Sequence, residues 1–509
     1  MPRYKPQSVQ SLMLPVVLSE QIVPGSFAFA LNYLVDHELD MSELDARFRN
    51  DETGASAYDP RVMLKIVLLA YCQGLISSRA IERACATNVQ FIAISGDSQP
   101  SHAHIAKFVN HLGQQIKSLF TQVLMVCDAQ GLIGREMFAI DGVKLPSNAS
   151  KERSGTHAEL AHRAHRMEQA ATKIVALHQS QDNATAEQPL DDKRQQRVDA
   201  LRAEAQRTRE FLAQAPKRTN AQGKELKTNL SDPDSAKMAT SKGVIQGYAA
   251  QAAVDSKNQV IVAADVIGSG SEQSMLLPMV EQSQPLAHEQ TLYTADAGYH
   301  SDANVTALKA QGTPALIADN QMRQRDERFR NQGKYKPKDD VLYDKQPTGQ
   351  DTPSKPVKFF KPADFRFNGD NTCTCPAGKL LTSSGVIYKI RGYERQDFKA
   401  QAADCKGCPK RAQCLRHPDK TTARVVSLHK RQLDPDSATQ RMQRAIDSPR
   451  GRQLYSQRIG TVEPVFANIR HNKGLHRFNL RGQAKVNTQW HLYCLVHNIE
   501  KLANSAWMR

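Results

Sequence analysis

The sequence of 509 residues has no apolar run long enough to cross a membrane. A membrane-spanning helix needs roughly 20 apolar residues, whereas the longest candidate, residues 62–71, is short and contains Lys65. The N-terminal residues also lack the continuous apolar core and the small-residue cleavage site of a secretory signal. These absences predict a cytoplasmic protein without a membrane partner.

The cysteines do not suggest a disulfide framework, because there are nine of them, an odd number, spread over the chain. This usage is typical of a reducing compartment. No internal repeat of the length found in solenoids or propellers is present. Since single hydrophobic cores stop growing near roughly 250–300 residues, we expect more than one domain.

Acidic residues are scarcer than basic ones, and the imbalance belongs to one part of the chain. The formal net charge is +16; residues 1–150 hold 12 Lys and Arg against 14 Asp and Glu, so residues 151–509 carry +18. Excess positive charge favours polyanions through counterion release, which makes nucleic acid the leading candidate partner and predicts association with the nucleoid. The alternative is a basic protein without such a partner.

Residues 1–130 have the pattern of a helical domain. Apolar residues at helical spacing between Pro60 and Gly74 predict one helix, and serine-capped starts of further helices follow. Two helices joined by a tight turn can read DNA, and Arg79 and Lys107 would then contact it. A helical bundle without DNA contact is the alternative.

Residues 131–318 alternate between strand and helix patterns. Apolar runs indicate a strand that reaches Asp141, a later hairpin, and a strand that leads to Asp296, with helices between them. This order predicts a mixed α/β layer with the two Asp residues on neighbouring strands. Charged helical periodicity over about 155–216 predicts an inserted helical hairpin, and the polar residues 216–240 predict a surface loop.

The composition changes again at residues 319–435, which predict a basic and cysteine-bearing insertion. The polar first part of this insertion is expected to be flexible. Residues 436–509 return to helical patterns, with Ser448 and Pro449 at the start of a long helix. Pro464 lies inside that helix and should kink it.

Three acidic residues stand in settings that can gather carboxylates. Asp141 and Asp296 lie at the ends of short apolar runs, and Glu463 lies in the Arg-rich C-terminal helix. Hard cations such as Mg²⁺ take oxygen ligands and share them with substrate phosphates, so a carboxylate cluster in a basic protein suggests phosphodiester chemistry. The alternatives are a turn at Asp141, a helix cap at Asp296 and an ion pair between Glu463 and Arg458.

A second cluster consists of cysteines. The CxxC pair of Cys405 and Cys408 is a familiar half of a zinc site, and Cys375 and Cys414 would supply the other half, with Cys373 as a spare or substitute ligand. Such a zinc ion would be structural and distinct from the catalytic ions; the alternative is a subdomain without metal. The remaining cysteines lie among apolar neighbours and are expected to be buried: Cys72, Cys85, Cys127 and Cys494.

The stretch of residues 464–499 contains no acidic residue. Its basic residues follow steps of three and four, although Gly474 and Gly482 interrupt any single helix. Such a surface would position a DNA backbone, or it is a solvated basic face. The candidates are Arg470, Lys473, Arg477, Arg481 and Lys485.

The order of these blocks resembles the insertion-sequence DDE transposases of bacteria, in the type with a helical domain ahead of an interrupted RNase-H-like core. The resemblance runs over nearly the whole chain. In the wider family Glu follows Arg by four residues and Lys follows Glu by seven, whereas here Glu463 follows Arg458 by five and Arg470 takes the later position. Relatives usually have an acidic residue between Ser269 and Gln273, and Glu272 matches that position approximately. The main blocks are Tyr58-Asp59-Pro60-Arg61, Asp141-Gly142-Val143-Lys144, Asp232-Pro233-Asp234-Ser235, Asp296-Ala297-Gly298-Tyr299, and Tyr455, Arg458 and Glu463.

The resemblance implies an α/β fold, with an RNase-H-like mixed-sheet core that carries insertions and follows an all-α domain. It implies a DDE transposase that cleaves DNA at the ends of its element and transfers the 3′-hydroxyls into target DNA. Asp141, Asp296 and Glu463 would hold two Mg²⁺ (or Mn²⁺) ions roughly 3.5–4 Å apart. The alternatives are a DNA-binding protein that does not cut and a nuclease without strand transfer.

The same resemblance implies the partners. They are the terminal inverted repeats of the element and the target DNA, bound by a homodimer. Within the matching blocks, the side chains that would contact DNA are Lys144, Tyr455 and Arg458.

Overall fold

The computed structural model describes residues 17–47, 56–113, 115–181, 192–219, 223–240, 243–326, 359–390, 393–431, 437–505 and 507. The chain divides into two compact units. The larger unit comprises residues 1–320 and 445–509, and the smaller unit comprises residues 321–444.

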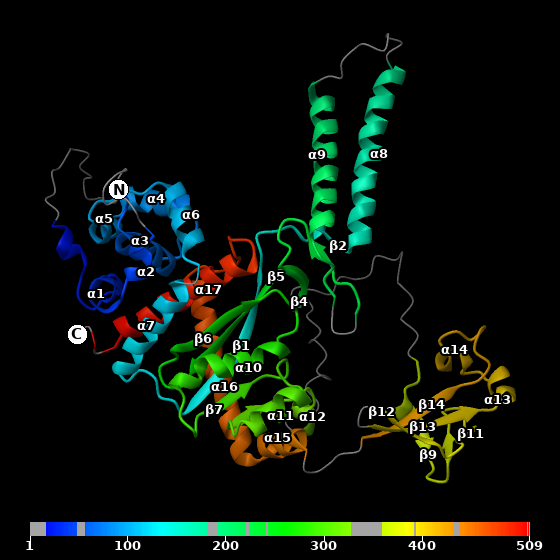
Figure 1. Cartoon of the computed structure of the whole chain (residues 1–509). Coiled ribbons are helices and arrows are strands. Elements are labelled where there is room, and N and C mark those ends of the chain that lie inside the picture. The colour runs from blue at the N-terminus through cyan, green and yellow to red at the C-terminus, as the bar shows by residue number, and fades with distance from the viewer. Residues whose placement is uncertain are drawn as a thin grey trace, which may run out of the picture. The chain divides into compact units, whose positions relative to one another are not determined.

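The first part of the larger unit is helical (Figure 1). Its helices are α1 (Phe27–Tyr33), α2 (Ser42–Asp45), α3 (Pro60–Cys72), α4 (Ser78–Thr87), α5 (Val89–Ser95), α6 (His102–His111) and α7 (Gln115–Ala129). Asp59 caps α3 by accepting a hydrogen bond from the backbone N–H of Arg61, and Ser77 and Ser101 cap α4 and α6 in the same way. The predicted helix starts are therefore correct in this part.

A mixed sheet forms the centre of the larger unit. Its strands are β1 (Met137–Pro146), β4 (Ala236–Thr240), β5 (Gly243–Asp255), β6 (Ile261–Ile267), β7 (Leu292–Ala295) and β8 (Ala315–Ile317). The order is β4-β5-β1-β7-β8, and β6 also pairs with β5. β5 is antiparallel to β1, whereas β7 is parallel to both β1 and β8. The predicted fold class, α/β with a helical N-terminal region, is confirmed.

Part of the predicted surface loop at 216–240 is sheet, so that prediction is wrong there. β4 pairs antiparallel with the first residues of β5. Among its side chains only Met238 is buried, so the alternation that marks a half-buried strand is too weak to recognise. A second strand of this segment, β3 (Thr228–Asn229), pairs antiparallel with β2 (Ser154–Gly155), which lies earlier in the chain.

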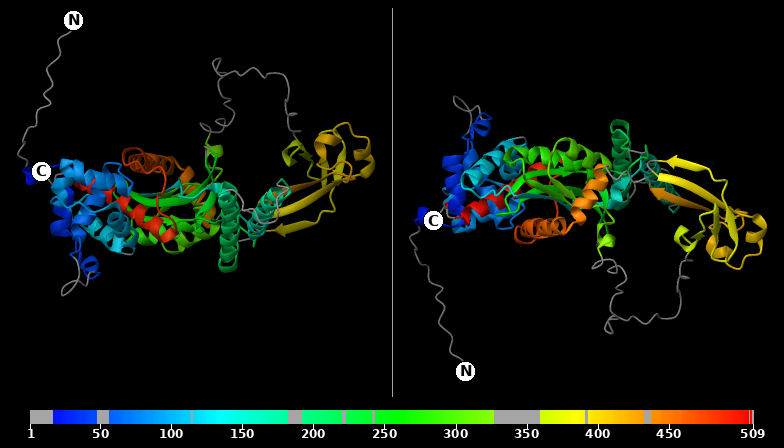
Figure 2. Two further views of the ribbon diagram at one scale, coloured as in Figure 1. Left: turned by 90° about the horizontal axis from the view of Figure 1, so that it is seen from above. Right: turned by 90° about the horizontal axis from the view of Figure 1, so that it is seen from below.

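Helices cover the sheet and join it to the N-terminal part. They are α10 (Leu276–Ser283), α11 (Asp302–Ala310), α16 (Pro449–Ala467) and α17 (Gln483–Ala503). α17 packs against β6, α7 and α3, and Figure 2 shows this red helix beside the blue and cyan helices and the green sheet. Trp490 Nε1 donates a hydrogen bond to the carbonyl of Gln251 at 2.9 Å, and Asn498 bonds both backbone groups of Ile261. The last helix is therefore fixed to the sheet by direct hydrogen bonds.

The predicted helical hairpin corresponds to α8 (His157–Gln181) and α9 (Asp192–Gln214), which pack along each other. Leu160, Ala164 and Ala171 of α8 are buried, as are Val198 and Ala205 of α9, while their other faces are charged. In the described part of the chain no helix combines the length and apolar character that a membrane crossing requires.

The smaller unit contains a second antiparallel sheet, which the sequence patterns did not predict. Its strands are β9 (Arg366–Phe367), β10 (Thr372–Thr374), β11 (Leu380–Thr382), β12 (Ile387–Ile390), β13 (Tyr393–Ala400) and β14 (Val425–Arg431). The order is β12-β13-β11-β10-β9, with β14 also beside β13. The residues of this unit also include the short helices α12 (Met322–Arg325), α13 (Ala402–Lys406) and α14 (Arg411–Cys414) and most of α15 (Ala438–Asp447). Most of the polar segment predicted to be flexible lies outside the described residues.

Candidate active site

The two Asp residues meet where the pairing of β1 and β7 ends. The last pair of this ladder is Ile140 with Ala295, so Asp141 and Asp296 each follow it by one residue. β1 itself continues to Pro146, paired with β5, and Asp141 therefore lies within its strand rather than at the end that the apolar run suggested. The β1 side chains change from buried to half-buried at Asp141, because the neighbouring strand β7 has stopped.

Arg458 of α16 joins the two carboxylates. Its Nη1 atom lies 3.1 Å from Oδ2 of Asp141, and its Nη2 atom lies 3.9 Å from Oδ2 of Asp296. The arginine side chain is only 8% exposed, and its guanidinium carbon lies 5.9 Å from the centroid of the Tyr455 ring. A buried cation shared by two carboxylates offsets their mutual repulsion.

Glu463 approaches the same place from α16, which packs against β1, β5 and β7. Its side chain is exposed. Burial raises the pKa of Asp141 above its usual range; Arg458 and the backbone N–H of Gly142 oppose this shift, while the charges of Asp296 and Glu463 add to it. The structure therefore brings the three predicted acids within electrostatic range of one another.

A fourth acidic residue, Glu272, borders the site. Its side chain is 12% exposed, and its Oε1 atom lies 4.0 Å from Nζ of Lys144. A Cβ atom built on Gly298 would lie 3.0 Å from Oδ1 of Asp296 and 3.3 Å from Oε2 of Glu272, so this glycine separates the two acids. Burial raises the pKa of Glu272, and Lys144 opposes the shift. The sequence marked Glu272 only as an approximate family match, because burial is not visible in its polar surroundings.

A buried glutamine explains the glycine that follows Asp141. Gln251 of β5 pairs with Gly142 of β1, and a Cβ atom at position 142 would come within 2.5 Å of the Gln251 side chain. The hydroxyl of Tyr299 donates a hydrogen bond to Oε1 of Gln251. These contacts tie the turn after Asp296 to the centre of the sheet.

The side chains predicted to contact DNA differ in how exposed they are. Lys473 is buried, and its ammonium lies 2.6 Å from Oε1 of Glu500, so the prediction that it contacts DNA does not fit the structure. The helical spacing of the basic residues in the sequence does not reveal which of them become buried. Lys473, in the turn after α16, is one that does. The exposed candidates are Arg79, Lys107, Arg477, Arg481 and Lys485, the half-buried ones are Lys144, Tyr455 and Arg470, and Arg458 is buried.

The basic residues of 464–499 do not share one helical face. α16 continues through Pro464 and passes into a π-helical turn at Asn468–Asn472. Gly474 and Gly482 have φ angles of +71° and +83°, which favour glycine and allow the chain to turn. Between them Arg477 and Arg481 donate hydrogen bonds to backbone carbonyls of residues 147 and 148. These arginines therefore border the segment that follows β1.

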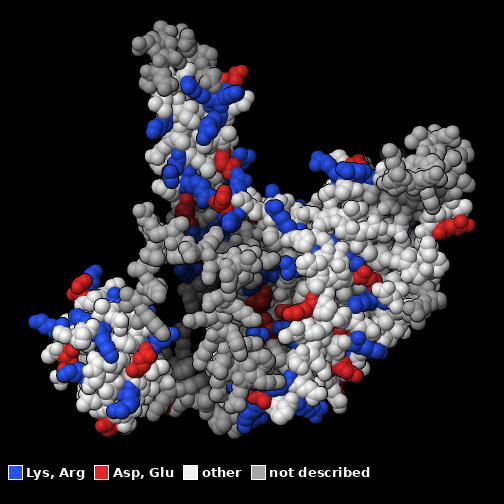
Figure 3. Space-filling view, turned by 180° about the vertical axis from the view of Figure 1, so that it is seen from behind, with Lys and Arg blue, Asp and Glu red and all other residues white. Residues whose placement is uncertain are grey.

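One face of the larger unit shows acidic side chains gathered near its middle, with Lys and Arg side chains around them (Figure 3). Basic side chains also lie along the helical hairpin in this view. A polyanion can approach carboxylates only where nearby cations offset the repulsion. This distribution of charge is compatible with such an approach.

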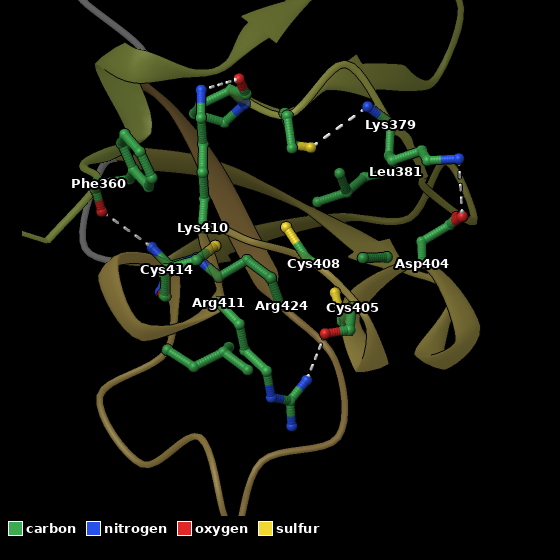
Figure 4. A pocket seen from close by; sticks show the side chains of 15 residues that line it. Phe360, Lys379, Leu381, Asp404, Cys405, Cys408, Lys410, Arg411, Cys414 and Arg424 are labelled. Atoms are coloured by element: carbon green, nitrogen blue, oxygen red, sulfur yellow. Dashed lines mark hydrogen bonds and ion pairs between the residues drawn. The ribbon is translucent and has the colours of Figure 1, made fainter.

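In the smaller unit, Cys375, Cys405, Cys408 and Cys414 line one cavity (Figure 4). Cys373 does not line it but lies in the apolar core of the unit. In the larger unit, four cysteines were expected to be buried. Cys85, Cys127 and Cys494 are buried, whereas Cys72 is half-buried.

The acid cluster fits a hard cation by the chemistry of its donors, since all of them are carboxylate oxygens. In the conformation described, however, the guanidinium of Arg458 lies between Asp141 and Asp296. Within the described ranges, no three His, Cys, Asp or Glu side chains are arranged to hold a metal ion as they stand. A metal ion at this place would therefore compete with Arg458 for Oδ2 of Asp141 and of Asp296.

Comparison with known families gives two matches. Residues 374–503 match the model described as a transposase DDE domain, and residues 16–111 match a transposase domain (DUF772). No curated protein matches the chain. Transposases of this class act on DNA, cleave nucleic acid and generally use divalent metal ions. The two matches, at the two ends of a chain whose central part gathers the acids, support its assignment to the insertion-sequence DDE transposases.

Proposed function

We propose that this transposase cleaves DNA at the ends of its own element and joins the freed 3′-hydroxyl groups to target DNA. The observation that carries the proposal is the approach of Asp141, Asp296 and Glu463 to one another around Arg458. Like charges gathered in a half-buried place oppose folding, and such an arrangement is typical of a site that binds cations.

The same carboxylates are the proposed ligands of the divalent ions: Asp141, Asp296 and Glu463 would hold them. Mg²⁺, or Mn²⁺ in its place, would supply activation of the attacking oxygen and stabilisation of the leaving oxygen. Arg458 holds the two Asp side chains together until it is displaced. Its planar guanidinium can then donate hydrogen bonds to a DNA phosphate.

DNA is held by basic side chains outside the acid cluster. Arg79 and Lys107 of the N-terminal helices are proposed to contact the terminal repeats, and two copies of the chain to act on a pair of ends. Nearer the acids, the proposed contacts to the phosphate backbone are Lys144, Tyr455, Arg458, Arg470, Arg477, Arg481 and Lys485. The net charge of +18 on residues 151–509 supports binding of a polyanion and association with the nucleoid.

The test is cleavage of a labelled duplex that carries an element end, with Mg²⁺ present. Asp141→Asn removes one ligand charge without changing the size of the side chain, and we expect cleavage to fall by at least about 10²-fold, the scale of a lost electrostatic stabiliser. The matched control is Glu136→Gln, because Glu136 is exposed and directly precedes the other end of β1. Unchanged cleavage by Asp141→Asn would refute the assignment.

A second assay separates the rival functions. Precleaved ends with free 3′-hydroxyls are mixed with a target plasmid, and joined product is measured. A nuclease without strand transfer would cut the first substrate but give no joined product. Absence of cleavage by the unmodified protein on any cognate end would favour a DNA-binding protein that does not cut.

A further inference from the structure

The smaller unit holds a group of thiols that the cleavage chemistry does not use. Cys375 follows β10 directly, Cys405 belongs to α13, Cys408 follows that helix, and Cys414 ends α14. All four line one cavity of about 30 Å³, and Figure 4 shows the sulfur atoms of the three labelled cysteines directed into the same space. A cavity of this size exceeds the roughly 10–15 Å³ that one water needs and can therefore admit a single ion.

The first part of the cluster is a tight turn that presents the sulfur of Cys375. The backbone N–H of Lys379 donates to Sγ of Cys375 at 3.3 Å, and the N–H of Gly378 donates to the Cys375 carbonyl at 2.8 Å. Gly378 has a φ angle of +80°, a conformation that glycine adopts without strain. A backbone N–H directed at sulfur orients and stabilises a thiolate that binds a metal.

The second part is held against this turn by two lysines. Nζ of Lys410 donates a hydrogen bond to the carbonyl of Pro376 at 2.8 Å, and Nζ of Lys379 lies 3.6 Å from Oδ1 of Asp404. All four thiols line the same cavity, so they are near neighbours although they come from separate segments.

The charge around the cavity suits an anionic centre. Lys379, Lys410, Arg411 and Arg424 line it, against one acidic residue, Asp404. Nε of Arg424 is buried without a hydrogen-bond partner in the described residues. Four thiolates around Zn²⁺ carry a net charge of −2, which this cationic lining would offset.

The smaller unit has a small apolar core. In its described part, the buried apolar cluster consists of seven residues: Phe365, Cys373, Leu381, Phe398, Ala400, Ala423 and Val426. Natural folds with small cores often add disulfides or a metal. The described cysteines are all free, so a disulfide does not fill this role.

We propose that Cys375, Cys405, Cys408 and Cys414 bind one structural Zn²⁺ ion in the smaller unit. The sulfurs as described do not yet form a coordination group, so binding requires them to move closer together until each lies about 2.3 Å from the ion. With four protein ligands the ion has no open position and takes no part in cleavage. Cys373 is not a ligand, because its side chain belongs to the core beside the cavity.

The test uses the full chain, purified without chelators, and counts zinc by mass spectrometry. We expect about one zinc per chain, and a loss of most of it in Cys408→Ser. Cys72→Ser, in the larger unit, and Cys373→Ala, in the core of the same unit as the cavity, should keep the metal. Loss of zinc in Cys373→Ala with retention in Cys375→Ser would show that the proposal names the wrong cysteine of this pair.

Because a ligand variant can lose metal through misfolding, the wild-type chain is also loaded with Co²⁺. Four thiolates in a tetrahedral site give intense sulfur-to-cobalt absorption, and this measurement needs no substitution. A metal-free native chain, with all four thiols open to a thiol reagent, would overturn the proposal. Asp141→Asn should keep its zinc whatever happens to cleavage, so failure of the cleavage proposal and failure of the zinc proposal can be told apart.

Discussion

Arg458 determines the electrostatics of the acid cluster. It is the least exposed member of the group, and it contacts both Asp141 and Asp296. The same residue was expected from the family resemblance to contact DNA. The two roles are compatible if the guanidinium is a counter-ion in the absence of metal and a phosphate ligand in its presence, because one cation cannot fill both positions at once.

The variant Arg458→Gln tests this at the scale of one side chain. Without divalent ions, we expect a loss of about 1–3 kcal/mol of unfolding free energy. This is less than the usual cost of breaking a buried pair, because Asp296 is 41% exposed. Mn²⁺ should then raise the melting temperature of the variant more than that of the wild type, since the ion takes over the role of the lost cation.

Thermal unfolding in chelator and in Mn²⁺ measures both effects without an activity assay. Arg79→Gln is the matched control, because Arg79 is exposed on α4 and remote in sequence from the acids. Equal stability of Arg458→Gln and wild type in chelator would show that the arginine does not hold the carboxylates.

At the scale of elements, strong periodicity was sufficient to predict the parts that carry the acids. The apolar runs before Asp141 and Asp296 belong to two parallel neighbours, β1 and β7, as the order of blocks indicated. The capped start at Ser448 is the N-cap of α16. These signals are local, so the sequence reveals them without knowledge of tertiary contacts.

The elements that could not be predicted are those whose order depends on contacts distant in the sequence. The short strands β9, β10 and β11 have two or three residues each, too few for a periodic pattern. Likewise Lys473 is buried beside Glu500, and Glu272 is largely buried beside Lys144 of β1 and the turn after Asp296. Spacing of charges alone could not distinguish these residues from surface positions.

Two glycines of α16 provide a test at this scale. A Cβ atom on Gly451 would lie 2.0 Å from the backbone carbonyl oxygen of Ala445, whereas one on Gly460 would meet no atom within 4 Å. Gly451→Ala should therefore displace the start of the helix that carries Arg458 and Glu463, at a cost of roughly 1–3 kcal/mol. Gly460→Ala should instead stabilise the chain by about 0.5–1 kcal/mol.

Chemical denaturation gives both free energies, and the cleavage assay shows whether the displacement reaches the acids. If Gly451→Ala were as stable and as active as Gly460→Ala, the junction before α16 would not set the position of the catalytic side chains.

For the whole molecule, the division of charge is the property that relates most directly to DNA. Residues 1–150 are nearly balanced, whereas residues 151–509 carry +18. The strands of the central sheet other than β1, the hairpin, the smaller unit and the last helices all belong to the positive part. Binding to DNA should therefore depend strongly on salt, and most of this dependence should arise outside the N-terminal helices.

The last prediction concerns this salt dependence, measured by fluorescence anisotropy with an element-end duplex. A protein that neutralises 6–10 phosphates loses about 10³–10⁵ in affinity between 50 and 200 mM salt. Arg481→Gln should reduce the slope of log affinity against log salt by about one, as expected for one phosphate contact. Lys309→Gln is the control, because Lys309 is exposed on α11 and has no proposed role. An equal slope for both variants would remove Arg481 from the DNA interface, since a contact to phosphate has to release counterions.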